Sequence, residues 1–267
     1  MKKAFIILFV YLSMILVFNA LLNIILLPTS PAKITFADAD TASACAMCLV
    51  FSLIISVIYL CLRSFSRQPL KGCFVLPTAG VAILALAGLV LTDCISSAMI
   101  NLASIPSIMP TGGPGLTKTP IGIITLCVIV PVAGVLTFQR GIMGSLLESK
   151  VFHKYALILS SLILGISNVD PQQAVSAFTA GLFLGWLYLR THSMILPILC
   201  FMLSNASSIM QDYIYSAHPA LGNFMNSTTV NITTLAVSCV LLVPVLLVLN
   251  KKLSNKKMSC TTECKEY

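Results

Sequence analysis

Long apolar stretches separated by short polar connections dominate the pattern of this chain. A membrane-spanning helix needs about 20 mostly apolar residues, because the hydrocarbon core of a bilayer is about 30 Å thick. The candidate stretches cover residues 4–27, 43–62, 74–92 (with an extension to 103), 119–147, 154–168, 172–189, 193–211 and 229–250. The pattern therefore predicts an all-α, polytopic membrane bundle of about eight transmembrane helices.

The first apolar stretch begins directly after Met1, Lys2 and Lys3, as a secretory signal does. It continues to residue 27, which is longer than the roughly 7–15 apolar residues of a cleaved signal. We therefore expect it to be retained as the first transmembrane helix.

Charged residues are too rare for a protein that faces water. They make up 9% of the chain, against 58% hydrophobic residues, whereas a soluble domain carries about 25% charged residues. The net charge is +8, but the basic residues stand at the ends of apolar stretches and do not form a groove suited to phosphates. We expect the lipid bilayer to be a partner of this chain and nucleic acid not to be one.

The basic residues also predict an orientation. With eight spans and the N-terminus in the cytoplasm, only Lys33 and Lys118 among the basic residues fall outside. The external segments hold Asp38, Asp40, Asp170 and Asp212. Basic residues concentrate on the cytoplasmic side of membrane proteins, so the prediction is N-in and C-in. The compact, signal-poor chain is typical of a multi-pass protein of a bacterial cytoplasmic membrane.

One transmembrane domain over residues 1–253 and a short polar cytoplasmic tail over residues 254–267 account for the chain. Most cysteines stand singly inside apolar stretches, where cysteine behaves as a small buried hydrophobe. The pairs Cys45/Cys48 and Cys260/Cys264 have no second ligand pair nearby. We therefore predict no metal site from them, and their role stays open.

Two ionisable residues fall within or near the predicted spans, where charge is costly and often functional. Asp93 lies near the external end of the third span, and we expect it to reach the headgroups. Arg140 lies in the fourth span, roughly 12 Å from its cytoplasmic end at 1.5 Å per residue. It can snorkel to the interface or hold polar groups of neighbouring helices, and the residues around it favour the second interpretation.

Several residues from Arg140 onward follow a known order. Arg140-Gly141 is followed by Ser160-Ser161-Leu162, by the segment from Gly181 to Thr191 with Ser193 and Pro197, and by Asn205. This order and spacing resemble the CPBP family, also called the CAAX protease or bacteriocin-processing family of intramembrane metalloproteases. The resemblance implies a helical membrane fold with a family-like core at about residues 119–211.

The family signature has two adjacent glutamates and an arginine on one helix, then Phe-x-x-x-His and His-x-x-x-Asn on later helices. In this chain the glutamate positions fall on Val135 and Leu136, and Arg140 matches the arginine. The Phe-x-x-x-His positions fall on Leu164 and Asn168, and the last pair falls on Phe201 and Asn205. Val, Leu and Phe offer neither a base nor a metal ligand.

The predicted depths of these positions in the membrane are similar, as expected if they derive from one active site. Counted from the predicted cytoplasmic ends, Val135, Asn168, Phe201 and Asn205 lie roughly 13–20 Å deep at 1.5 Å per residue. We interpret the region as a degenerate active site with no confident catalytic residue and no cofactor. Zinc is expected only where the family site is intact.

No other group of residues supplies the missing chemistry. By the predicted topology His153 and His192 are cytoplasmic and His218 is external, so the three cannot share one metal ion. A surface cluster of Glu148, His153 and His192 stays a minor alternative. The glutamates of the chain, Glu148, Glu263 and Glu266, all lie outside the predicted spans.

The leading hypothesis is therefore a catalytically inactive CPBP homologue that binds transmembrane segments of other proteins as a regulator or scaffold. In that role Arg140, Asn168 and Asn205 would act as polar contacts between helices. The first alternative is an active, divergent endopeptidase that cleaves prenylated or other membrane-associated peptides. The second is a transporter or channel component, with Asp93 and the Pro/Gly-rich loop at 104–119 as its hints.

Overall fold

The computed structural model describes residues 4–13, 50–59, 77–107, 120–149, 153–168 and 170–263, with side chains as far as Leu253. Throughout this part of the chain the regular structure is helical and contains no strand. The two N-terminal predicted spans are described only as the short apolar helices Ala4–Ser13 and Val50–Tyr59. Their remaining residues, and the pair Cys45/Cys48, lie outside the described residues.

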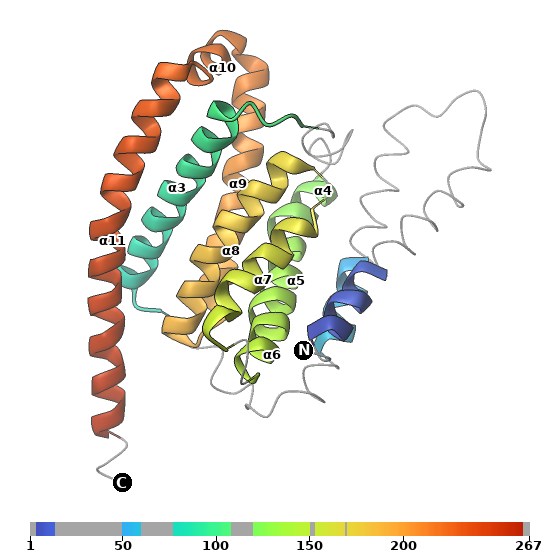
Figure 1. The fold of residues 1–267 in the computed structure, drawn as a ribbon, viewed down its shortest axis with the longest axis vertical. Helices are drawn as coiled ribbons and strands as arrows, with labels where there is room; N and C mark the ends of the chain where they lie inside the picture. The colour runs from blue at the N-terminus through green and yellow to red at the C-terminus, as the bar shows by residue number, and fades with distance from the viewer. Residues whose placement is uncertain are drawn as a thin grey trace, which may run out of the picture.

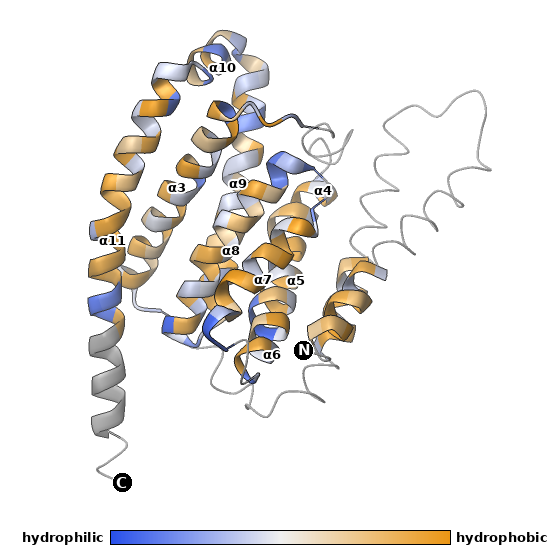
Figure 2. Ribbon diagram, in the orientation of Figure 1, coloured by the Kyte–Doolittle hydropathy of each residue, from blue (hydrophilic) through white to orange (hydrophobic). Residues whose placement is uncertain are grey.

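Three helical segments are long and apolar enough to cross a membrane, among the residues that the structure describes. They are α3 (Ala79–Leu102), the continuous segment Pro120–Leu147, and the first part of α11, Thr228–Leu253. Figure 2 shows their predominantly hydrophobic surface. A multi-pass, all-helical membrane protein is therefore confirmed, and the number of eight spans stays a prediction.

The remaining helices complete the bundle (Figure 1). They are the 3₁₀ turn η5 (His153–Tyr155), α7 (Ala156–Ile166), α8 (Pro171–Thr191), α9 (Ile195–Ala217) and α10 (Pro219–Met225). At 1.5 Å per residue, α8 and α9 are each roughly 30–35 Å long. Both carry polar residues in the half nearer α10, and these lower their overall hydropathy.

Several helices end later than the apolar pattern predicts. Helix α3 continues to Leu102, as its predicted extension allowed, and α9 continues to Ala217 rather than residue 211. Helix α11 continues to Glu263, so the predicted polar tail begins as helix. A helix does not have to stop where its apolar residues stop. α9 ends just before His218-Pro219, where the proline disfavours helical backbone at the residue before it.

Two hydrophobic clusters hold the helices together. In the first, α3, α8, α9 and α11 meet, and Phe183 lies so close to Gly88 that a Cβ there would stand 2.9 Å from its ring. Trp186 packs beside Phe183, with ring centroids 6.3 Å apart. The second cluster joins Ala4–Ser13, the segment Pro120–Leu147, α7 and α8.

Most basic residues of the described chain lie at one end of the bundle, together with Glu148 at the end of α6 (Gly144–Leu147). Lys154, Arg190, Lys251 and Lys252 lie toward the end where α8 gives way to α9, which we call the basic end. Asp170 and Asp212 lie toward the opposite end, which we call the α10 end. The predicted orientation places the basic end in the cytoplasm.

Candidate functional site

The segment Pro120–Leu147, which carries the first aligned motif, is not a regular α-helix. It alternates α4 (Pro120–Ile124), the π-helix η3 (Thr125–Ile129), α5 (Val130–Gly134), the π-helix η4 (Val135–Met143) and α6 (Gly144–Leu147). π-helical turns are rare and frequently occur at functional sites. Here η4 coincides with the stretch from the two glutamate positions through Arg140.

Pro131 explains why the carbonyl of Leu126 in η3 has no N–H donor within its own helix. The N–H of Val130 donates to the carbonyl of Thr125, five residues earlier. The carbonyl of Leu126 would next accept from residue 131, but proline has no N–H. An unsatisfied backbone group inside a membrane costs several kcal/mol by order of magnitude.

Asn205 supplies the missing donor. Its Nδ2 donates to the carbonyl oxygen of Leu126 at 2.7 Å, across the interface between α9 and η3. The predicted role of Asn205 as a polar contact between helices therefore has a definite partner. This bond is structural, since it satisfies a carbonyl that Pro131 leaves open.

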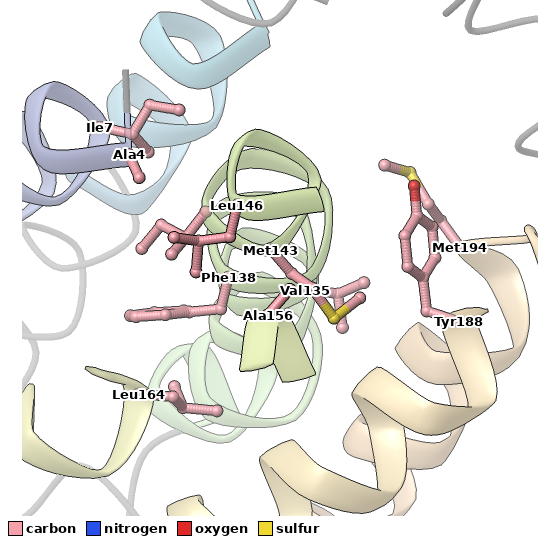
Figure 3. Packing of buried hydrophobic residues seen from close by; sticks show 11 residues of the cluster. Ala4, Ile7, Val135, Phe138, Met143, Leu146, Ala156, Leu164, Tyr188 and Met194 are labelled. Atoms are coloured by element: carbon pink, nitrogen blue, oxygen red, sulfur yellow. The ribbon is translucent and has the colours of Figure 1, made fainter. Parts of the chain in front are cut away.

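Four aligned positions belong to or border one apolar cluster, of which Figure 3 shows Val135 and Leu164. Val135 and Leu164 are buried in it, and Leu136 and Phe201 pack against it from the side. A Cβ on Gly134 would stand 3.0 Å from Cε1 of Phe201, so this ring lies directly on the backbone that precedes Val135. Of the positions expected at one depth, Val135 and Phe201 belong to or border this cluster, whereas the side chains of Asn168 and Asn205 are not part of it and bond to backbone carbonyls.

Small residues bring α7 and α8 close to this cluster. A Cβ at Gly181 would stand 3.1 Å from Cδ2 of Leu164 and 3.2 Å from Ser161, and one at Gly185 would stand 2.6 Å from Leu157. Close approach of this kind is typical of helix contacts in membranes. The family-like segment that begins at Gly181 therefore positions the second motif helix.

Arg140 and its neighbour Gln139 are buried polar residues within η4. Arg140 is 5% exposed, so it does not snorkel to the interface. Gln139 is 3% exposed, and its Oε1 has no hydrogen-bond partner among the described residues. Sequence reasoning did not single out Gln139, although a polar residue next to an intramembrane arginine was an available signal.

Asn168 does not connect two helices as predicted. Its Nδ2 donates to the carbonyl oxygen of Leu164 at 2.9 Å, which lies in the last turn of its own helix, α7. The side chain therefore satisfies one of the four carbonyls that every helix leaves open at its C-terminus. Asn168 thus helps to end α7.

The residues at the aligned positions do not fit a catalytic zinc ion. Zinc is bound by thiolate, imidazole or carboxylate groups, whereas the glutamate and histidine positions of the family carry a valine, a leucine, an asparagine and a phenylalanine here, namely Val135, Leu136, Asn168 and Phe201. No group of three or more potential ligands occurs within the described ranges. Glu148, His153 and His192 thus do not assemble a metal site, and the ring of His153 instead contacts the Leu147 carbonyl at 2.9 Å.

Asp93 lies elsewhere than expected. It does not extend to the headgroups but faces α9, where the hydroxyl of Ser204 donates to its Oδ2 at 2.8 Å. The sequence offers no signal for this pairing, because the two residues lie on helices far apart in the chain. Asp93 therefore belongs to the α3–α9 interface.

The fold is that of a multi-pass helical membrane protein in which the motif helices meet at one apolar cluster. Residues 117–207 match the family model described as type II CAAX prenyl endopeptidase Rce1-like. The chain thus carries an Rce1-like domain, consistent with a CPBP family intramembrane protease. Comparison with curated proteins and with solved structures gives no match.

Proposed function

We propose that this protein is a catalytically inactive CPBP-type homologue that binds transmembrane segments of other proteins. The observation that carries the proposal concerns Phe201, which stands at a histidine position of the family. Its phenyl ring lies so close to Gly134, next to Val135, that a Cβ on this glycine would stand 3.0 Å from it. An intact site needs space for a metal ion, a water molecule and a peptide carbonyl. In this chain apolar side chains occupy that level of the bundle.

The binding role follows from what the domain retains. The motif helices keep their close packing through Gly165, Gly181 and Gly185. Buried Gln139 remains in η4, where a donor from another membrane segment could pair with its Oε1. Polar contacts of this kind between membrane helices contribute about 0.6 kcal/mol on average. We place the protein in a bacterial cytoplasmic membrane, with the basic end inside.

A cleavage assay tests the loss of catalysis. Purified protein in liposomes is incubated with a library of peptides and prenylated peptides, and products are identified by mass spectrometry. A CPBP protease with intact glutamates and histidines serves as the positive control. We expect cleavage by the control alone. Cleavage by this protein that disappears in an Arg140→Ala variant would establish the active-endopeptidase alternative instead.

Site-directed photocrosslinking tests the binding role. A photoreactive amino acid replaces half-buried Leu136 at the aligned site, or Val240 on α11, which is 70% exposed, as the matched control. We expect crosslinks to transmembrane segments of other proteins from position 136 and only lipid adducts from position 240. The same products from both positions would contradict a specific site.

A further inference from the structure

Asp93 is a carboxyl group deep within a membrane-spanning helix. It precedes Leu102, the last residue of α3, by nine residues, which corresponds to roughly 13 Å at 1.5 Å per residue. Its side chain is half-buried, and its contact, Ser204 on α9, is 9% exposed. This interface is separate from the aligned cluster, because the next residue, Asn205, bonds to η3 instead.

No described cation neutralises this carboxyl group. Within the described ranges Asp93 forms no ion pair. Lys154, Arg190, Lys251 and Lys252 lie at the opposite end of the bundle, and buried Arg140 belongs to η4, which is not among the helices packed against α3. A carboxylate in hydrocarbon is costly unless it is paired or loses its charge. Binding of a proton would remove this charge and its cost.

The groups around Asp93 are neutral side chains from every helix packed against α3. From α9 come Ser204 and the buried thiol of Cys200. From α11 comes Ser238, which is hydrogen-bonded to Cys94 of α3. From α8, Phe183 packs at Gly88. These partners offer too few oxygen atoms to surround a metal cation, but they accommodate a neutral carboxylic acid.

Polar side chains connect this position to the α10 end. On α9, Ser204, Ser208 and Gln211 recur at a spacing of three to four residues and so share one face of the helix. Ser208 and Gln211 are exposed. On α3, Ser96 follows Asp93, and Asn101 donates to Asn231 of α11 at 3.1 Å. Water at the α10 end thus has a polar path toward the carboxyl group.

We propose that Asp93 and Ser204 form a proton-binding site inside the membrane, reached from the α10 end along the polar face of α9. The reaction is a proton transfer alone. A proton from water binds to Asp93 Oδ1, while Oδ2 keeps its hydrogen bond from Ser204, and the group becomes neutral. Release returns the proton to water by the same path. The site is independent of catalysis and of partner binding at Leu136.

Carbodiimide labelling tests this site. Dicyclohexylcarbodiimide is an apolar reagent that reacts with protonated carboxyl groups in membranes to give a stable N-acylurea. The full-length protein in liposomes is labelled over a range of pH, and its peptides are analysed by mass spectrometry. We expect labelling at Asp93 that falls as the pH rises. A Ser204→Ala variant should shift this decline to higher pH, because the carboxylate loses its donor.

Three comparisons decide the outcome. Asp93→Asn should abolish the modification, and Asp212→Asn, at the end of the same polar face, should leave modification of Asp93 intact. Absence of label on Asp93 at every pH at which the protein remains folded would overturn the proposal. Protection by sodium ions at constant pH would also overturn it, in favour of a sodium site. Asp93→Asn should still crosslink from position 136, which separates this site from the proposed function.

Discussion

A phenyl ring at a histidine position changes both the chemistry and the shape of the site. Phe201 has no lone pair for a metal and no proton to exchange, and its ring occupies the space beside Gly134. A side chain at position 134 would crowd this ring, since an added Cβ would stand 3.0 Å from its Cε1. The small residue at position 134 and the ring at position 201 therefore fit each other.

A double-mutant cycle measures this matching. Gly134→Ala should destabilise the protein by about 1–3 kcal/mol through overpacking against Phe201. Phe201→Ala should cost about 2–3 kcal/mol, less than the ~3–5 kcal/mol of a fully buried ring, because the ring is half-buried. The combination should cost less than the sum, since the new methyl group then has space. The measurement is the free energy of unfolding in mixed micelles titrated with dodecyl sulfate.

Ala133→Gly on the same helix is the control, because it adds no atom beside the ring. It should be additive with Phe201→Ala. Additivity for Gly134→Ala as well would show that the ring and this glycine do not contact each other.

At the scale of a helix, the segment Pro120–Leu147 shows how a proline leaves a backbone carbonyl without a donor and how a side chain from another helix supplies one. Pro131 withdraws an N–H, the chain forms a π-helix at Thr125–Ile129, and Asn205 donates to the carbonyl of Leu126. Asn205 therefore has a structural reason to be asparagine that does not involve an oxyanion.

Asn205→Ala should destabilise the protein by about 1–3 kcal/mol, because it leaves the Leu126 carbonyl without a donor. In a Pro131→Ala background the same substitution should cost less, since residue 131 then provides an N–H. The free energies of unfolding of the four proteins, measured under one set of conditions, give the coupling. Equal costs in both backgrounds would indicate that the two residues act independently.

This segment also shows what the sequence could and could not predict. The apolar pattern gave its limits as 119–147, close to the observed Pro120–Leu147, because the length of an apolar stretch decides a membrane span. The π-helices were not predicted, and the carbonyl of η3 finds its donor 79 residues later in the chain. The pairing of Asp93 with Ser204 was missed because these two residues also lie far apart in the chain. The positions of the family motifs could be located in the sequence because the spacing between them is kept even where the residues differ.

At the scale of the whole molecule, the separation of charge makes a prediction about orientation. A reporter that fluoresces only in the cytoplasm should be active when fused after Tyr267, because α11 runs toward the basic end. An alkaline phosphatase inserted at exposed Leu221 of α10 should be active outside. As the control, the two reporters are exchanged between the two positions. The reverse pattern would show that the basic end faces outward.

The contact between Phe183 and Trp186 has a practical consequence. Trp186 is the only tryptophan in the chain, and it packs against the hydrophobic cluster that joins α3, α8, α9 and α11. The intrinsic emission of the protein therefore arises mainly at this junction and reports on it without a label. Its wavelength and its quenching by brominated lipid acyl chains would follow the docking of α3 and α11 onto α8 in real time.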